Sequence, residues 1–131
     1  MHSRIPALLL ALATVGCGAQ MEYAVDHTLL SPDGTRRAVQ YHGMGGGAAG
    51  VCTQGVRVLS GAIPVPTGES IRPEPGSEPF SVSCGSQVRL RWRAADTLEV
   101  AYTVDDVGVQ VWQRATVDDG RTHLTFVAQH E

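Results

Sequence analysis

QVRLRWRAADTLEVAYTV, residues 87–104, carries the pattern that decides the fold. Apolar side chains occupy every second position in both halves of the stretch, at Val88, Leu90 and Trp92 and again at Leu98, Val100, Tyr102 and Val104. Strict alternation of this kind is typical of strands that bury one face and expose the other. The short segment 94–96 predicts a hairpin loop. We therefore expect two antiparallel strands that turn the same apolar face inward.

A second hairpin is predicted upstream, from residues 23–30 and 36–42, which alternate in the same way around the segment SPDGT. The connecting residues suit a tight turn. Pro32 presets the backbone φ angle, the Asp33 side chain can accept a bond from the backbone ahead of it, and Gly34 tolerates a positive φ. The turn chemistry and the alternation therefore indicate the same local structure.

Further strands are expected at 51–59, where Gly55 is interpreted as a bulge, and at 80–84. Residues 109–117 and 121–127 predict another hairpin, because an Asp-Gly turn separates two alternating runs. The Gly-rich segment 43–50 is interpreted as a connector, and the Pro-rich segment 64–79 as a long surface loop. With no helical period after residue 20, the sequence predicts an all-β domain. We expect a small antiparallel meander of about seven strands, curled into a sandwich or an open barrel.

The N-terminal segment has a basic start, a short apolar centre and small residues before Cys17. These features are typical of a secretory signal peptide, and the apolar run is shorter than the roughly 20 residues that a permanent spanning helix needs. The end of the segment resembles the bacterial lipobox, in which a peptidase cleaves before a cysteine that carries diacylglycerol. Val15 and Gly16 fit that pattern, whereas Thr14 stands where the lipobox usually has leucine.

This resemblance implies that residues 1–16 are a lipoprotein signal peptide and that Cys17 is acylated. Residues 17–22 would then form a tether and residues 23–131 a single β domain, with 115 residues left after cleavage, enough for one small core. The alternative is an ordinary signal peptide cleaved near Ala19, with Cys17 discarded.

Cys52 and Cys84 remain as an even pair of cysteines in an exported chain, which predicts a disulfide. Each cysteine shares the apolar parity of its own strand, so both thiols should face inward. In the chain-entropy description such a bridge stabilises the fold by about 3–4 kcal/mol. A metal site is the weaker interpretation, because neither cysteine has a second ligand at metal-binding spacing.

The stretch LLSPDGTRRAVQY, residues 29–41, resembles the blade motif of TolB-type β-propellers. The motif occurs once, and a propeller needs several four-stranded blades, so the length excludes that fold. A closer resemblance is to small bacterial envelope proteins of unknown function, often lipoproteins, that carry a single SPDG hairpin. It extends to about residue 104 through Gly45 to Gly47, Val56, Val58, Trp92 and the Leu98-x-Val100-x-Tyr102 strand. This resemblance implies a fold and a compartment and implies no chemistry.

One candidate binding face follows from the alternation. Arg89, Arg91 and Arg93 share the polar face of one strand, with Glu99 expected beside them on the next. Trp112 and Arg114 share the polar parity of a later strand. Together these residues suit an anionic or aromatic ligand, such as lipid head groups, a glycan or a partner protein. The alternative is a solvated, charge-balanced face on which the Pro-rich loop covers Trp112.

No catalytic constellation is found in the sequence, and we predict that the protein is not an enzyme. The sequence lacks a G-x-S-x-G elbow and a nucleophile near a base. The glutamates Glu69, Glu74 and Glu78 lie in the Pro-rich loop, whereas a catalytic pair of carboxylates needs a fixed separation. The histidines His27, His42 and His123 lie on separate strands without metal-binding spacing, and a soft-metal clip of His42 and Met44 is the weaker interpretation of these residues. We expect no cofactor and no metal. A net charge of −3, with ten arginines and no lysine, does not favour nucleic acid as a partner.

The sequence therefore predicts a lipid-anchored, non-enzymatic domain of a bacterial envelope that acts as a binding or structural module. The expected partners are the membrane, through the N-terminal lipid, and an envelope protein or glycan. Gly18 and Ala19 lack the aspartate that marks inner-membrane retention, which favours the periplasmic face of the outer membrane. The alternative is a soluble periplasmic or secreted domain that binds a ligand or inhibits an enzyme through residues 64–79.

Overall fold

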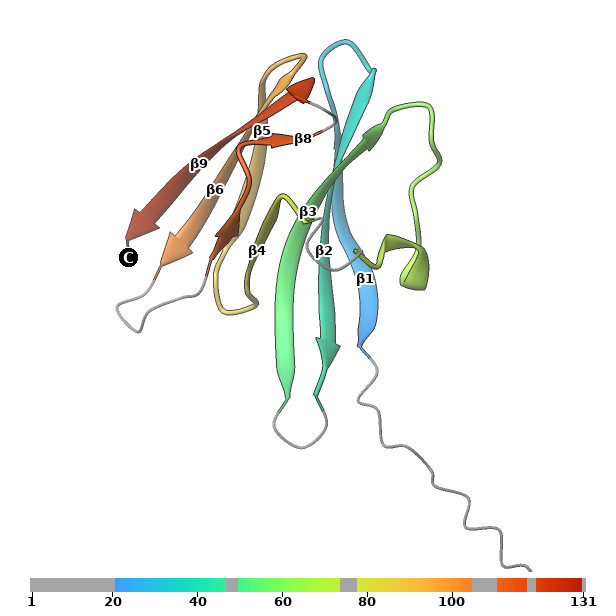
Figure 1. Cartoon of the computed structure of the whole chain (residues 1–131). Helices are drawn as coiled ribbons and strands as arrows, with labels where there is room; N and C mark the ends of the chain where they lie inside the picture. Colours follow the sequence, from blue (N-terminus) through green and yellow to red (C-terminus); the bar gives the residue numbers. More distant parts are fainter. Residues whose placement is uncertain (1–20, 47–49, 74–77, 105–110, 118–119, 131) are drawn as a thin grey trace, which may run out of the picture.

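The computed structural model describes residues 21–46, 50–73, 78–104, 111–117 and 120–130, which form two facing β-sheets (Figure 1). Sheet A has the strand order β1-β2-β3-β4-β7 and sheet B the order β5-β6-β9-β8. The strands are β1 (Glu22–Leu30), β2 (Arg36–Gly45), β3 (Val51–Ser60), β4 (Phe80–Ser83), β5 (Val88–Ala94), β6 (Thr97–Val104), β7 (Trp112–Gln113), β8 (Thr116–Val117) and β9 (Thr122–His130). The predicted all-β sandwich is confirmed. The structure has nine strands where about seven were expected, in part because the single predicted strand 109–117 is divided into β7 and β8.

The SPDG hairpin joins β1 to β2 antiparallel, as predicted. The Ser31 hydroxyl donates to Asp33 Oδ1 at 2.8 Å, and the Thr35 backbone N–H donates to the same oxygen at 3.1 Å. These bonds to the charged form hold the pKa of Asp33 below its usual value, the Ser31 bond being the largest cause. Gly34 has a φ of 71°, which explains the glycine at this turn position. The turn residues therefore have the roles that the sequence indicated.

Sheet B departs from a pure antiparallel meander. β5 and β6 form the predicted antiparallel hairpin, but β6 and β9 pair in parallel along their full lengths. The predicted strand 109–117 is divided between the sheets, because β7 pairs with β4 and β8 pairs with β9. The switch occurs between adjacent residues: the Arg114 N–H donates to Pro79 O, and Ala115 O accepts from the Leu124 N–H. Strands that change sheets in this way form the corners of β-sandwiches.

The main core lies between the two sheets. It consists of the inward members of the alternating pattern, Ala38, Val56, Phe80, Val82, Leu98, Val100, Tyr102 and Leu124. A second, smaller cluster lies on the outer face of sheet A, where Ile71 of the 3-10 helix η2 (Gly68–Ile71) packs against Val39 and Tyr41. The segment expected to be a surface loop is therefore docked at Ile71, which is fully buried. An isolated isoleucine within a Pro-rich, polar segment carries no periodicity that reveals this contact.

Cys52 and Cys84 form the predicted disulfide, with their Cα atoms 5.4 Å apart and 32 residues between them in sequence. The bridge ties β3 to the turn that leads from sheet A into sheet B. Gln54 reinforces the same junction, since its Nε2 donates to Ser83 O at 3.1 Å and to Ser86 O at 2.6 Å. The crossover between the sheets is thus fixed by a covalent bond and by hydrogen bonds.

Arg36 joins the two sheets near the SPDG turn. Its Nε donates to the Thr122 hydroxyl at 2.9 Å, its Nη1 to Ala95 O at 3.0 Å and its Nη2 to Arg121 O at 3.2 Å. The guanidinium of β2 therefore binds both the β5–β6 turn and the start of β9. We call this group of contacts the Arg36 clamp.

Replacing Arg36 with alanine is expected to lower the free energy of unfolding by about 2–3 kcal/mol, because it removes three hydrogen bonds from a charged donor, two of them partly buried. Arg36→Lys should recover little of this loss, since one ammonium cannot reproduce the planar fork of donors. Urea unfolding monitored by tryptophan fluorescence measures the effect. The control is Arg72→Ala, because Arg72 is exposed and its ion pair with Glu69 lies at 3.6 Å. Equal losses in Arg36→Ala and Arg72→Ala would contradict the clamp.

Candidate functional site

The three arginines of β5 lie on the outer face of sheet B, at the edge of that sheet. Arg89 stands opposite Ala101 and Arg91 opposite Glu99. Beyond them in register lie Val127 and Thr125 of β9. Because these neighbours are mostly small and uncharged, no bulky side chain screens the arginines from solvent. We call the three arginines and this surface beside them the arginine face.

One of the three arginines is neutralised by the carboxylate that the sequence placed beside them. Arg93 donates to Glu99 Oε2 from Nε at 2.7 Å and from Nη2 at 2.6 Å. The register shift between Trp92 and Ala94 removes Arg93 from the regular pairing. Arg89 and Arg91 have no hydrogen-bond or ion-pair partner among the described residues. The face therefore retains two unpaired positive charges on alternate positions of one strand.

Trp112 and Arg114 do not join the arginine face. Trp112 lies on β7 in sheet A, opposite Ser81, and its side chain is 54% exposed. Its indole N–H donates to Glu78 O at 3.0 Å, so the end of the Pro-rich segment holds the ring without covering it. Arg114 follows in the corner between the sheets, with its backbone N–H on Pro79 O. The structure thus divides the five candidate residues between two surfaces, and binding at either surface stays a prediction.

The structure also contains a histidine–carboxylate pair that the sequence did not predict. His42 Nδ1 lies 2.7 Å from Asp26 Oδ1, and both side chains are about one-third exposed. The register partner of His42 is Ala24, and Asp26 sits at the register shift between Val25 and His27, so its contact with His42 involves a bulge that the alternation does not reveal. Among the described residues, no hydroxyl or thiol is hydrogen-bonded to this histidine, and no group of three His, Cys, Asp or Glu side chains is placed to hold a metal. Met44, the other member of the soft-metal clip, is 55% exposed.

A second group of polar side chains, Tyr41, Arg57 and Glu78, lies on the outer face of sheet A near Gly55. The predicted bulge at Gly55 is wrong, because β3 pairs with β2 and β4 there without a register shift. The glycine instead makes room for Tyr41, whose ring crosses from β2 over the position that a Cβ at residue 55 would occupy. Cross-strand aromatic–glycine contacts of this kind cover backbone that a glycine leaves bare.

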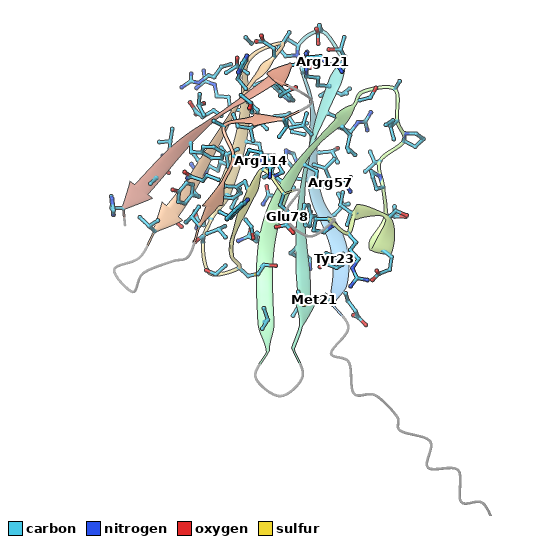
Figure 2. All side chains as sticks on the ribbon, viewed as in Figure 1. Met21, Tyr23, Arg57, Glu78, Arg114 and Arg121 are labelled. Carbon is cyan, nitrogen blue, oxygen red and sulfur yellow. A yellow bond between two sulfur atoms is a disulfide. The ribbon has the colours of Figure 1, made fainter. Side chains whose placement is uncertain are left out.

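The Tyr41 hydroxyl is buried and has no hydrogen-bond partner among the described residues. Burial raises the pKa of Tyr41 above its usual range, and the charge of Glu78 adds to this rise while Arg57 opposes it. Burial also raises the pKa of the Glu78 carboxyl. Figure 2 labels Arg57, which belongs to β3, and Glu78, which precedes β4 in sequence. Arg57 itself is held there by a bond from Nη1 to Ile71 O at 3.2 Å. This group is closed over by the docked segment.

Two further observations bear on the site. Cys17, the predicted lipidation residue, lies outside the described residues. Within the described part of the chain, no helix has the length and apolar character needed to cross a bilayer. Comparisons with protein-family models, with curated proteins and with solved structures found no match for this chain.

Gly55→Ala is expected to destabilise the protein by about 1–3 kcal/mol, because the added Cβ would overlap the buried Tyr41 side chain. Gly85→Ala is the matched control, since no atom lies within 4 Å of a Cβ at that position. Tyr41→Phe combined with Gly55→Ala should recover part of the loss by removing the overlapping oxygen. Chemical denaturation of the four proteins measures these differences. Equal stability of Gly55→Ala and the wild type would contradict the packing described for Tyr41.

Proposed function

We propose that this chain is a lipid-anchored, non-enzymatic binding module of a bacterial envelope. In this proposal Cys17 carries the lipid, the domain faces the periplasm from the outer membrane, and the arginine face binds anionic lipid head groups of that membrane. The observation that carries the proposal is that Arg89 and Arg91 are exposed and have no neutralising partner in the part of the chain that the structure describes.

The chemistry of guanidinium suits phosphate-bearing head groups. Arginine offers two parallel N–H donors that match two phosphate oxygens, and it gives up its hydration more readily than an ammonium does. Basic residues close to an anionic membrane contribute about 1 kcal/mol each to binding. Arg89 and Arg91 are therefore expected to supply most of the attraction, while Glu99 diminishes the contribution of Arg93.

The position of the predicted anchor supports contact with the membrane. Only residues 17–21 separate the proposed acyl group from β1, and five extended residues reach at most about 18 Å. Such a tether keeps the domain close to the lipid surface, so even a weak attraction of the arginine face acts at high effective concentration. The Cys52–Cys84 disulfide agrees with an oxidising compartment such as the periplasm.

A soluble ligand-binding or inhibitor domain is the second candidate. The observation in its favour is Trp112, a half-exposed aromatic side chain held in place by the backbone of Glu78 at the end of the Pro-rich segment. Exposed tryptophans with a fixed orientation are common at binding sites. The state of Cys17 separates the two candidates.

The anchor is tested first. Mass spectrometry of the protein isolated from a bacterial envelope is expected to show a mature chain that begins at Cys17 and carries acyl groups. Cys17→Ala should release the protein into the soluble fraction, because several acyl chains together provide stable anchoring. A mature chain that begins after Ala19 and carries no lipid would contradict the anchored proposal and support the soluble one.

The arginine face is tested with the soluble Cys17→Ala protein and vesicles of phosphatidylglycerol or phosphatidylcholine. We expect preferential binding to phosphatidylglycerol, weakened about fivefold by Arg89→Ala or by Arg91→Ala and weakened by salt. Arg72→Ala is the control, because Arg72 is also an exposed arginine but lies directly after η2, away from this face. Co-sedimentation measures the fraction bound.

Unchanged binding after both Arg89→Ala and Arg91→Ala would contradict the role of the arginine face. A soluble anionic polysaccharide provides the second arm of the same experiment. Tighter, arginine-dependent binding to that polymer than to the vesicles would make an anionic glycan the ligand and would overturn the proposal of lipid head groups.

A further inference from the structure

The exposed edges of the two sheets differ in how well they are protected against pairing with a strand of another molecule. β5, one edge of sheet B, carries Arg89, Arg91 and Arg93 and contains a register shift. β1, one edge of sheet A, contains a bulge with Asp26 and packs against η2. β7, the other edge of sheet A, is two residues long. Charges, bulges, covering segments and short strands are the usual means by which proteins prevent edge-to-edge association.

β9 lacks these protections. The register of β8 reaches only Thr122 and His123, and the Leu124 N–H adds one bond to Ala115 O, so among the described residues the rest of β9 extends beyond β8 with one side unpaired (Figure 1). The segment LTFVAQH, residues 124–130, contains no proline and no Asp, Glu, Lys or Arg. Its last four residues are exposed, including Val127 at 39%. This edge is therefore open, neutral and rich in residues that favour strands.

The directions of the free backbone groups follow from two hydrogen bonds. The His123 N–H donates toward β6, to Asp96 O, and the Leu124 N–H donates toward β8, to Ala115 O. Because the direction alternates along a strand, the N–H and C=O groups of Phe126, Ala128 and His130 point to the open side. Those of Val127 and Gln129 point to β6. The open edge thus presents a row of unused backbone donors and acceptors.

We infer that the open edge of β9 pairs antiparallel with β9 of a second copy of this chain. A two-fold axis through Ala128 places Ala128 opposite itself and Phe126 opposite His130 of the second copy. Each of these is a hydrogen-bonded pair that exchanges two backbone bonds. Val127 lies opposite Gln129 of the second copy. The two sheets B then form one continuous sheet across the dimer.

A second copy fits this edge better than a different partner because of charge. Two identical strands present identical charges to each other, so a charged edge opposes self-pairing. The segment 124–130 carries no acidic or strongly basic side chain, so two copies of it can pair without repulsion between like charges. Because the edge is uncharged, charge complementarity cannot select a different protein as its partner. The inference does not depend on the lipid anchor, although anchoring to one membrane would concentrate the copies.

The pairing has a consequence for the proposed binding face. A two-fold axis perpendicular to a continuous sheet leaves equivalent faces of both copies on the same side. The arginine faces of the two copies therefore lie on one side of the joined sheet, and a dimer presents two such stripes to one surface. Simultaneous contact of both stripes strengthens binding without any new contact within either copy.

The test uses the full chain after export, with or without acylation, and measures its mass in solution by light scattering or sedimentation. The wild type is expected to be a dimer that dissociates on dilution. Ala128→Pro should yield monomers with the unfolding midpoint of the wild type at a dilution where it is monomeric, because the N–H that the substitution removes points to the open side. Val127→Pro is the contrasting control, since it removes a bond to β6 and should lower stability. A monomeric wild type at all concentrations, or a dimer that persists in Ala128→Pro, would overturn the inference.

A second variant covers the case in which Ala128→Pro fails to fold. Ala128→Cys places two cysteines opposite each other at the two-fold axis, where a hydrogen-bonded pair has a Cα separation of about 5.5 Å, within disulfide range. We expect a disulfide-linked dimer on non-reducing gels. Thr97→Cys, in β6 and away from the open edge, should give none. Failure of Ala128→Cys to cross-link under oxidising conditions would overturn the inference independently of any result with vesicles.

Discussion

The Arg36 clamp is the contact on which the arrangement of the two sheets depends. Its guanidinium satisfies two backbone carbonyls and the buried Thr122 side chain from the facing sheet. The SPDG turn fixes the arginine before it reaches across, because the Arg36 N–H donates to the Ser31 hydroxyl and Arg36 O accepts from the Ser31 N–H. The short-range chemistry of one turn therefore determines a long-range contact. Hydrogen bonds from a charged donor are among the stronger ones in proteins, so a single side chain can position both sheets.

The disulfide and Gln54 hold the crossover between the sheets, at a separate place along the chain from the Arg36 clamp. Two fixed points and a shared apolar core leave the sheets little freedom to slide. The surfaces that remain for function are then those outside the sandwich. On sheet A, Ile71 packs against Val39 and Tyr41 of the outer face, whereas no described segment packs in this way on the outer face of sheet B. The arginine face and the β9 edge both belong to this open side.

The sequence predicted the features that depend on local pattern. Alternation located the strands and placed Cys52 and Cys84 on compatible faces, and the turn residues identified the SPDG hairpin. The parallel pairing of β6 with β9 was not predictable, because alternation sets which face a residue occupies and not the direction of a neighbouring strand. For the same reason, alternation did not reveal that the predicted strand 109–117 divides between Arg114 and Ala115 and contributes to both sheets. The His42–Asp26 pair required knowledge of a bulge, and the docking of Ile71 required a lone apolar residue to be recognised within a polar loop.

The local distribution of charge reconciles a net charge of −3 with the proposed binding to an anionic surface. The field that a ligand meets is determined by the nearest side chains, since charges farther away than about 8–10 Å are largely screened at physiological salt. On the outer face of sheet B, Glu99 is engaged by Arg93, and Arg89 and Arg91 remain. Their Cα atoms lie two residues apart along the strand, about 6.6–6.8 Å, a spacing that lets the two side chains reach different phosphates. Net charge therefore bears on solubility, whereas the register of β5 and β6 determines which positive charges of the arginine face stay unpaired for the proposed ligand.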